Sequence, residues 1–351
     1  MKKRLAKFFL WFLVLVLAAG ATAGIMFNDL SKPAADQSDA VLFEIKSGDV
    51  LRKVAANLQE AGIVRSSLVV ELVARTENLT GLKAGVFVVD KNWSVKEILT
   101  TLNDSTKTIV DTVRITFPEG DWARDFARKL SNLTSVEKQQ LLDLWNDETF
   151  LRELMTRYEF LTEDILNPKT RIRLEGYLFP NTYEFFVNTN PREVTFKILD
   201  QTKRIYEKYK PQFQQSPLSV HEVFIMASIV QYEARTLDDM KKIASVFFNR
   251  LEINMPLQAS PTICYSLYDF TSWRDCESNP NIESPYNTYK YRGLPIGPIM
   301  NPGEWAILAV LEPADTDYYY FMADVYGGGT IHFARTYAEH KANVDKYLRG
   351  R

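Results

Sequence analysis

The spacing of hydrophobic residues divides the chain into two parts. Residues 8–27 form one apolar run without a charged side chain. From residue 41 onward, short runs of alternating apolar and polar residues are interspersed with stretches in which apolar residues recur every three or four positions. Alternation is typical of half-buried strands, and the longer period is typical of amphipathic helices. The sequence therefore predicts an apolar N-terminal segment followed by a folded region of the α+β class.

The apolar run is long enough to cross a membrane as one helix, because about 20 residues at 1.5 Å each span a hydrocarbon core of about 30 Å. The residues before it are basic, which favours a cytoplasmic N-terminus. We expect a cytoplasmic tail at 1–7, a transmembrane helix at 8–28 and a linker at 29–40. A cleaved signal peptide is the alternative, because residues 21–23 read Ala-Thr-Ala. Both interpretations place the rest of the chain outside the cytoplasm.

Residues 41–106 have the pattern of a small β-α-α-β-α unit. Strand-like runs lie at 41–46 and 86–89, and helical spacing follows each of them. Ser94 and Glu97 have the spacing of a capping box, in which the two side chains bond exposed backbone N–H groups. The strand-turn-helix opening resembles that of a LysM glycan-binding module. Glycan docking and a plain spacer both remain open for this unit.

Residues 107–351 predict a larger, mixed α+β domain. Residues 107–117 alternate as one half-buried strand. No repeat of fixed period occurs, which excludes solenoid folds. Helical patterns follow at about 121–130, 135–145 and 149–158, after Pro191, over 222–235 and after Thr236.

Composition and charge exclude several classes of protein. A chain with 46% hydrophobic and 25% charged residues can bury a core, and 351 residues suggest about two domains. Lysine and arginine number 42 against 44 acidic residues, so no basic field is present to hold nucleic acid. Cys264 and Cys276 are too few for a disulfide framework, and either one disulfide or two buried thiols is compatible with their number.

The stretch from Glu222 to Arg235 contains the strongest candidate for chemistry. Glu233 lies at i+7 from Met226 and at i+4 from Ile229, so in a helix its carboxyl group shares a face with apolar side chains. Loss of hydration raises the pKa of such a carboxyl group, as a general acid near neutral pH requires. The alternative is a glutamate that ends a helix and reaches solvent or pairs with Arg235.

Loops rich in proline, glycine, tyrosine and asparagine follow this helix. Tyrosine faces combined with amide and hydroxyl groups suit a sugar, which has apolar CH faces and many hydroxyl groups. Stiffening of the loops alone is the other interpretation. The loops lie at 257–262, 286–289, 293–299 and 301–303.

Searches for other known sites are negative. The chain has no serine elbow, phosphate-binding loop or dinucleotide fingerprint. His221 and Glu222 could begin a zinc-protease motif, but Ile225 stands where the second histidine is needed. His332 and His340 are expected to be surface residues or packed neutral imidazoles. We therefore expect neither a metal nor a cofactor.

Taken together, five motifs resemble the YceG-like (MltG-type) endolytic murein transglycosylases. The resemblance covers about residues 41–348. The chain departs from the family in having Gln231 where glutamate is frequent, and Asn181 and Ser260 where aspartate is usual, so no acidic role is expected at those positions. The motifs are Leu174–Pro180, Ala227–Glu233, Ala244–Leu251, Tyr286–Tyr289 and Gly293–Pro295.

The resemblance implies a function and a set of site residues. The family's catalytic glutamate falls on Glu233, which would cleave the β-1,4 bond from N-acetylmuramic acid to N-acetylglucosamine and leave 1,6-anhydro ends. Asn249 and Arg250 are expected to fix a loop against the catalytic helix. The residues expected to orient the sugar are Gln258, Tyr286, Asn287 and Thr288.

The resemblance also implies a setting for this activity. A single-pass protein of the bacterial cytoplasmic membrane, with its catalytic part outside, would meet nascent strands beside the glycan polymerases and could end their elongation. Two other functions remain open: a non-catalytic tether that binds peptidoglycan, and a muramidase that leaves reducing ends in place of anhydro ends.

Overall fold

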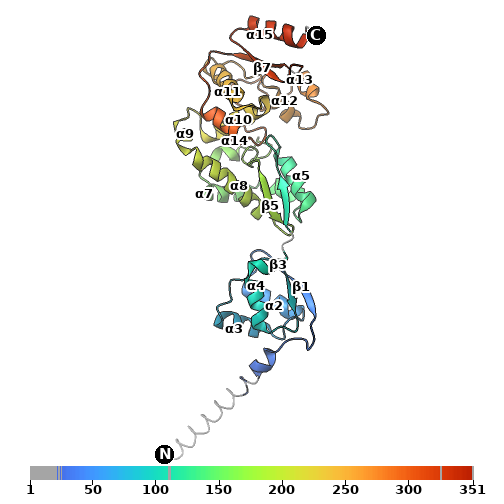
Figure 1. The fold of residues 1–351 in the computed structure, drawn as a ribbon. Helices are drawn as coiled ribbons and strands as arrows, with labels where there is room; N and C mark the ends of the chain where they lie inside the picture. The colour runs from blue at the N-terminus through green and yellow to red at the C-terminus, as the bar shows by residue number, and fades with distance from the viewer. Residues whose placement is uncertain (1–21, 23, 25, 110–111, 325, 350–351) are drawn as a thin grey trace, which may run out of the picture. The chain divides into compact units, whose positions relative to one another are not determined.

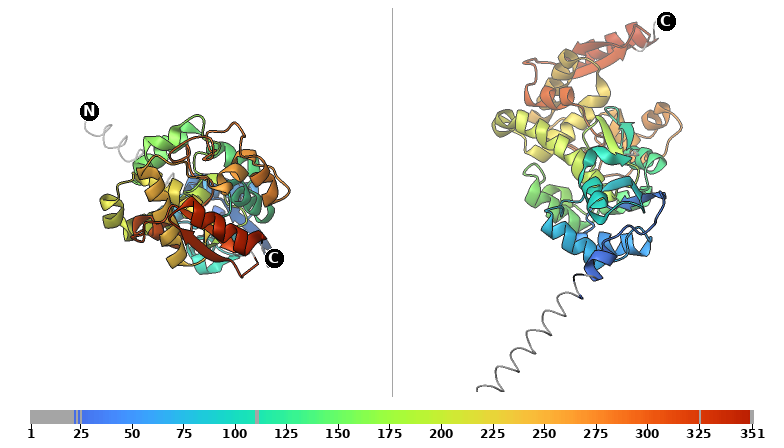
Figure 2. Two further views of the ribbon diagram at one scale, coloured as in Figure 1. Left: turned by 90° about the horizontal axis from the view of Figure 1, so that it is seen from above. Right: turned by 60° about the horizontal axis from the view of Figure 1, so that its bottom comes forward.

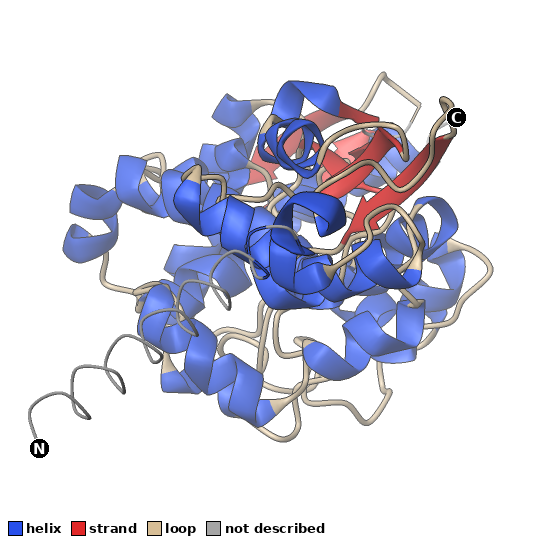
Figure 3. Cartoon of the chain, turned by 90° about the horizontal axis from the view of Figure 1, so that it is seen from below, coloured by secondary structure: helices blue, strands red, loops and turns tan. Residues whose placement is uncertain are grey.

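The computed structural model describes residues 22, 24, 26–109, 112–324 and 326–349. Within them the chain forms two compact units that divide between Thr112 and Val113. Helices predominate and the strands gather in small groups (Figure 1, Figure 3), which confirms the α+β class. Most of the predicted transmembrane segment, 8–28, lies outside the described residues. In the described part of the chain, no helix is both long and apolar enough to cross a bilayer.

The first unit contains the predicted β-α-α-β-α elements in the predicted order. Its three strands form an antiparallel sheet in the order β1-β2-β3, with Phe43 opposite Phe87 in the first pair. The elements are β1 (Ala40–Ile45), α2 (Leu51–Glu60), α3 (Ser67–Thr76), β2 (Gly85–Asp90), α4 (Val95–Asn103), a 3-10 turn (Ser105–Lys107) and β3 (Thr108–Ile109).

The periodicity of the sequence explains how this unit closes. Val54 and Leu58 lie one helical turn apart in α2, and both are buried with Phe87 of β2 in one core. The predicted capping box is present at the start of α4: Ser94 Oγ accepts from Glu97 N, and Ser94 N donates to the Glu97 carboxylate. No finding tests whether this unit binds glycan, so its likeness to LysM stays a prediction.

The single strand predicted at 107–117 is divided between the two units. β3 pairs with β2 in the first unit, whereas β4 (Thr112–Thr116) pairs with β5 (Thr182–Phe186) in the second. Residues 110 and 111 lie outside the described residues. Alternation reports which face of a strand is buried, but tertiary contacts choose the pairing partner, so the pattern gave no sign of the break.

The second unit contains one large core and most of the helices (Figure 1). The helices are α5 (Ala123–Leu133), α6 (Lys138–Leu144), α7 (Glu148–Arg157), α8 (Pro191–Lys208), α9 (Lys210–Gln215), α10 (Val220–Glu233), α11 (Leu237–Glu252), α12 (Ser260–Leu267), α13 (Trp273–Ser278), α14 (Glu304–Leu311) and α15 (Tyr337–Val344). A 3-10 turn at Glu163–Leu166, strands β6 (Tyr320–Asp324) and β7 (Thr330–Ala334) and a π-helical turn at Asp345–Arg349 complete it.

Helix α10 lies inside this core rather than on its edge. It contacts α11, α12 and α14, and every residue from 223 to 230 is buried. The sequence predicted a single apolar stripe, but the helix is enclosed on all sides. A helix that is hydrophobic all round is typical of such a central position. The position of Glu233 at the end of α10 is therefore set by the whole core.

The C-terminal hairpin packs next to α11. Strands β6 and β7 pair antiparallel, with Phe321 opposite Phe333, and α15 lies against both strands (Figure 2). Phe321 packs edge-on against Phe247 of α11 at a ring distance of 5.8 Å. This hairpin brings the backbone before β6 within reach of the polar residues at the end of α11.

Candidate active site

Glu233 is the last residue of α10, and local chemistry sets both ends of that helix. Ser219 caps the start, where its Oγ accepts from Glu222 N and its own backbone N donates to the Glu222 carboxylate. After Glu233 the backbone becomes extended at Ala234, and Thr236 caps α11. The predicted helix over 222–235 therefore ends two residues early and leaves Glu233 at its terminus.

The Glu233 carboxyl group is held without a strong partner. Burial raises its pKa to about 7, and the positive charge of Arg250 lowers it less. The negative end of the α10 dipole also disfavours the charged form. Among the described residues, none forms a hydrogen bond or ion pair with this carboxyl group, although its side chain is partly exposed. Pairing with Arg235 is thus not present, and the carboxyl group can exchange its proton with a bound molecule.

Two tyrosines flank this glutamate. Burial is the main cause that raises the pKa of both Tyr232 and Tyr289, and the charge of Glu233 raises each further. The charge of Glu277, on α13, acts on the same two phenols. Both rings therefore lie near Glu233, and they keep the protonated form that can donate a hydrogen bond to a ligand.

Asn249 and Arg250 hold backbone segments against the end of α11. Asn249 Nδ2 donates to Thr316 O at 2.8 Å and to Tyr318 O at 2.9 Å. Arg250 is buried, where its Nη1 donates to Leu257 O at 2.6 Å. Leu257 directly precedes Gln258, so Arg250 fixes the loop that was expected to carry a sugar contact. These positions support the predicted role for the two residues, which stays a proposal.

Gln258 is placed where a ligand could meet it. Its side chain is exposed, and its backbone has a φ of 50°, a left-handed conformation that side chains other than glycine rarely adopt. Gln258 N donates to Thr288 O at 3.1 Å, which holds this turn in place. Strained backbone that is fixed by its surroundings is frequent at functional sites.

Three other predicted sugar contacts are buried inside the loops. Tyr286 Oη accepts from Arg171 N at 3.0 Å, and Thr288 Oγ1 accepts from Ala259 N at 3.0 Å. Asn287 Nδ2 donates to two carbonyl groups of its own loop at 2.9 and 2.8 Å. Their polar groups are occupied, so the structure argues against direct contact with a sugar. We now propose that Tyr286, Asn287 and Thr288 position the turn at Gln258.

Gln231, one of the departures from the family pattern, joins two loops next to the site. Its Oε1 accepts from Gly303 N at 2.8 Å, and its Nε2 donates to Glu119 Oε2 at 3.3 Å. An amide can accept and donate at once, whereas a carboxylate at this position would repel Glu119. No role for Glu119 could be predicted from local spacing, because only the fold brings it to α10.

Glu175, within the Leu174–Pro180 motif, is a second unusual carboxyl group that the sequence did not single out. It is fully buried, and burial raises its pKa to about 8. Its oxygens accept from Ala123 N at 2.8 Å, Asn301 Nδ2 at 3.1 Å and Tyr265 Oη at 3.1 Å. The donors come from three separate segments, so no local pattern could have revealed this role.

The histidines and cysteines also take defined positions. His221 is buried, with its Nδ1 2.7 Å from Tyr177 Oη, and it is not available as a zinc ligand. No group of three or more metal-binding side chains occurs within the described residues. Cys264 and Cys276 form a disulfide, which decides between the two possibilities left open by the sequence.

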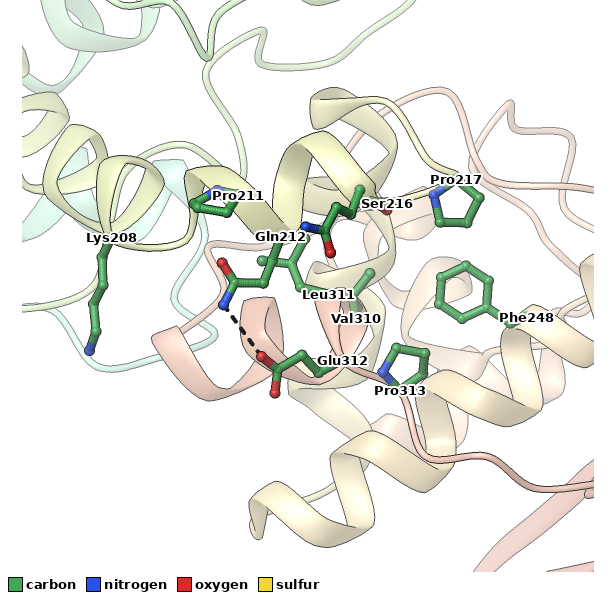
Figure 4. A pocket seen from close by; sticks show the side chains of 11 residues that line it. Lys208, Pro211, Gln212, Ser216, Pro217, Phe248, Val310, Leu311, Glu312 and Pro313 are labelled. Atoms are coloured by element: carbon green, nitrogen blue, oxygen red, sulfur yellow. Dashed lines mark hydrogen bonds between the residues drawn. The ribbon is translucent and has the colours of Figure 1, made fainter.

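Two hollows in the second unit differ in what they offer. One of about 740 Å³ lies among α8, α9, α11 and α14. Among the side chains that line it, a hydrogen bond joins Gln212 to Glu312 (Figure 4). None of the predicted site residues lines it. A smaller hollow of about 210 Å³ includes Tyr232, the direct neighbour of Glu233.

Comparisons with known proteins identify relatives of this chain. A relative from Bacillus subtilis (strain 168), named endolytic murein transglycosylase, is 33% identical over 89% of this chain and 86% of its own length. A relative of the same name from Streptococcus pneumoniae (serotype 2, strain D39) is 31% identical over 97% of this chain, which spans 64% of that protein.

A solved structure and a family pattern extend the comparison. The crystal structure of a YceG-like protein from Listeria monocytogenes matches with a TM-score of 0.60 and 30% identity, over 87% of this chain and 99% of that one. The pattern of the YceG-like family matches residues 43–346. This match includes both units and most of the chain, and we conclude that the protein belongs to the YceG-like family.

Proposed function

We propose that this chain is an endolytic murein transglycosylase, which cleaves peptidoglycan strands internally. The observation that carries the proposal is the Glu233 carboxyl group, whose pKa is raised to about 7 by burial and which has no hydrogen-bond partner among the described residues. A carboxyl group in this state can hold a proton at neutral pH and release it to a substrate. The names of the relatives from B. subtilis and S. pneumoniae support the same activity.

The proposed reaction needs one carboxyl group in two roles. Protonated Glu233 donates its proton to the oxygen of the β-1,4 bond while the bond from that oxygen to C1 of N-acetylmuramic acid breaks. The carboxylate then accepts the proton of the C6 hydroxyl group of the same sugar as its oxygen bonds to C1. The products are a strand that ends in 1,6-anhydro-N-acetylmuramic acid and a strand with a free N-acetylglucosamine hydroxyl group. No water is consumed.

Because the attacking group is part of the substrate, the main task of the protein is to orient the sugar. Hydrolytic glycosidases use a second carboxyl group to activate water or to attack the sugar. In the proposed reaction the attacking oxygen belongs to the substrate, so much of the rate comes from holding the sugar in a reactive shape. The phenols of Tyr232 and Tyr289 lie near Glu233, and the exposed turn at Gln258 is held by the same Arg250 whose charge acts on Glu233, so these groups are suited to that task.

The cellular setting is part of the proposal. We propose that the apolar run at 8–28 anchors the protein in the bacterial cytoplasmic membrane, with both units on the outer side. There it would meet nascent strands next to the glycan polymerases and end their elongation. Extraction of membranes with alkaline carbonate tests the anchor, because a spanning helix stays with the lipid whereas a cleaved leader leaves a released protein.

The chemistry of the products tests the activity directly. The full chain in detergent is incubated with peptidoglycan, and the fragments are separated and weighed by mass spectrometry. We expect internal fragments with 1,6-anhydro ends, which are 18 mass units lighter than ends formed by hydrolysis, since no water is added. Glu233→Gln has nearly the same size and cannot donate the proton, so we expect no fragments from it.

Each other outcome points to a different function. Reducing ends in place of anhydro ends would identify a muramidase. Binding to peptidoglycan without fragments from either protein would identify a tether. Anhydro fragments from Glu233→Gln would remove Glu233 from the reaction.

A further inference from the structure

The hollow of about 210 Å³ that Tyr232 lines has the features of a built binding site. It lies among the loop that leads into α5, the end of α10, the start of α12 and the segment that follows α12. Tyr232 lines it, and Tyr232 directly precedes Glu233 in α10. The hollow is smaller than the pockets that hold drug-sized ligands, so it has room for about one ring.

Aromatic rings form its walls. Trp122 is stacked on Tyr268 with ring centres 5.2 Å apart, and it meets the edge of Phe270 at 6.1 Å. The stack fixes the indole, while Phe270 keeps 40% of its surface exposed and Tyr232 keeps 50%. Exposed aromatic faces around a hollow mark an interaction site, since burial would otherwise be favoured.

The charged groups at the rim already have partners. Arg124 lies over both Trp122 and Tyr268, 4.4 and 4.2 Å from the ring centres, and its Nη1 donates to Asp269 at 3.0 Å. The two acidic residues of the rim, Asp121 and Asp125, pair with Lys129 and Arg128. The rim therefore offers hydrogen-bond donors and acceptors but little net charge.

These features favour a neutral sugar over a charged ligand. The CH face of a pyranose ring packs on aromatic side chains, and its hydroxyl groups bond to carboxylate and guanidinium groups. A stem peptide or a muramic acid carboxylate would bring a charge for which no unpaired counter-charge is available at this rim.

We propose that this hollow binds one N-acetylglucosamine residue of the glycan strand, next to the residue that undergoes cleavage. The inference rests on the proposed function, and it adds a subsite made of Trp122, Tyr232 and Phe270. Tyr232 lines this hollow, and the charge of Glu233 acts on the Tyr232 phenol, so a sugar bound in the hollow lies close to the carboxyl group.

Binding without catalysis tests this subsite. The full chain with Glu233→Gln is titrated with the trimer of N-acetylglucosamine, and Kd is measured from changes in the NMR spectrum. We expect Phe270→Ala, placed in the same protein, to raise Kd about tenfold, as one lost stacking contact would. The matched control is Phe186→Ala, a phenylalanine of β5 with 47% of its surface exposed, which should leave Kd unchanged.

The outcomes separate this inference from the proposed function. No binding of the trimer, or equal effects of the two phenylalanine variants, would overturn the subsite even if the protein cleaves peptidoglycan. A raised Kd for Phe270→Ala alone would support the subsite even if no anhydro fragments were found. Preferential binding of a free stem peptide, weakened by Phe270→Ala, would replace the sugar by a peptide and overturn the inference.

Discussion

Two carboxyl groups in the second unit, those of Glu175 and Glu233, have raised pKa values but opposite surroundings. Glu175 accepts three hydrogen bonds from separate segments, whereas Glu233 accepts none from the described residues. Burial alone would assign chemistry to both. The difference in hydrogen bonding shows that Glu175 joins parts of the fold, while Glu233 keeps its oxygens free for a ligand. A raised pKa therefore indicates function only where the group is also unpaired and accessible.

The largest expected effect is on the rate of peptidoglycan cleavage, when glutamine replaces either Glu233 or Glu175. Glu233→Gln should lower the rate of peptidoglycan cleavage at least about a thousandfold, because the proton donor is lost. Glu175→Gln should keep the rate within about threefold, because glutamine can accept two bonds and donate one to Tyr265. Rates of anhydro-fragment release measure both. A similar loss from the two variants would erase the distinction between the carboxyl groups.

The next largest effect is on the free energy of unfolding. Here we expect the change at Glu175 to cost more than the change at Glu233. Glu175→Ala leaves three buried donors without an acceptor, so we expect a loss of at least about 3 kcal/mol. Glu233→Ala removes no hydrogen bond that the described residues form, and stability should stay the same or rise. Denaturant titration of both variants gives these values. A larger loss from Glu233→Ala would show that this residue also holds the fold.

The smallest effect is a pH dependence that separates the two groups. The folded protein holds a proton on Glu175 up to about pH 8 and on Glu233 up to about pH 7, whereas the unfolded chain releases both near pH 4.5. Raised folded pKa values mean that stability falls as pH rises through this window, by about 1.4 kcal/mol per pH unit for each group. Between pH 7 and 8 the decline is therefore due mainly to Glu175, with a smaller part from Glu233.

Two measurements check this separation. Unfolding at pH 7 and pH 8 should show the decline in the unchanged protein and a flatter profile in Glu175→Gln. The cleavage rate, by contrast, should fall about tenfold per pH unit above pH 7 in both proteins, because only Glu233 supplies the proton. A rate profile that moved with Glu175→Gln would contradict this assignment.

Periodicity predicted the features that depend on near neighbours. The helix that carries Glu233, the capping box at Ser94 and the element order of the first unit all follow from residues within one or two turns. Glu175 could not be recognised in this way, because its donors lie at positions 123, 265 and 301. Its neighbour Gly176 is also fixed by a distant contact, since it has a φ of +87° and a Cβ there would lie 2.4 Å from Pro298.

Composition predicted which residue types surround the site but not the direction of their side chains. Tyr286, Asn287 and Thr288 have the groups that a sugar needs, and yet those groups are already used in hydrogen bonds within the protein. The aromatic hollow could not be predicted from the sequence either, because its residues come from separate segments. Trp122 and Phe270 are far apart in sequence, and only the packing of α5 against the segment after α12 brings them together.

The disulfide between Cys264 and Cys276 makes assembly of this region depend on its chemical surroundings. Cys264 lines the aromatic hollow, and the bond ties α13 to α12. Glutathione and thioredoxin keep cysteines reduced in the cytosol, so a chain retained there would have two thiols and a less constrained loop. A newly made copy would therefore complete this region only after export, in the same place where its polysaccharide is found.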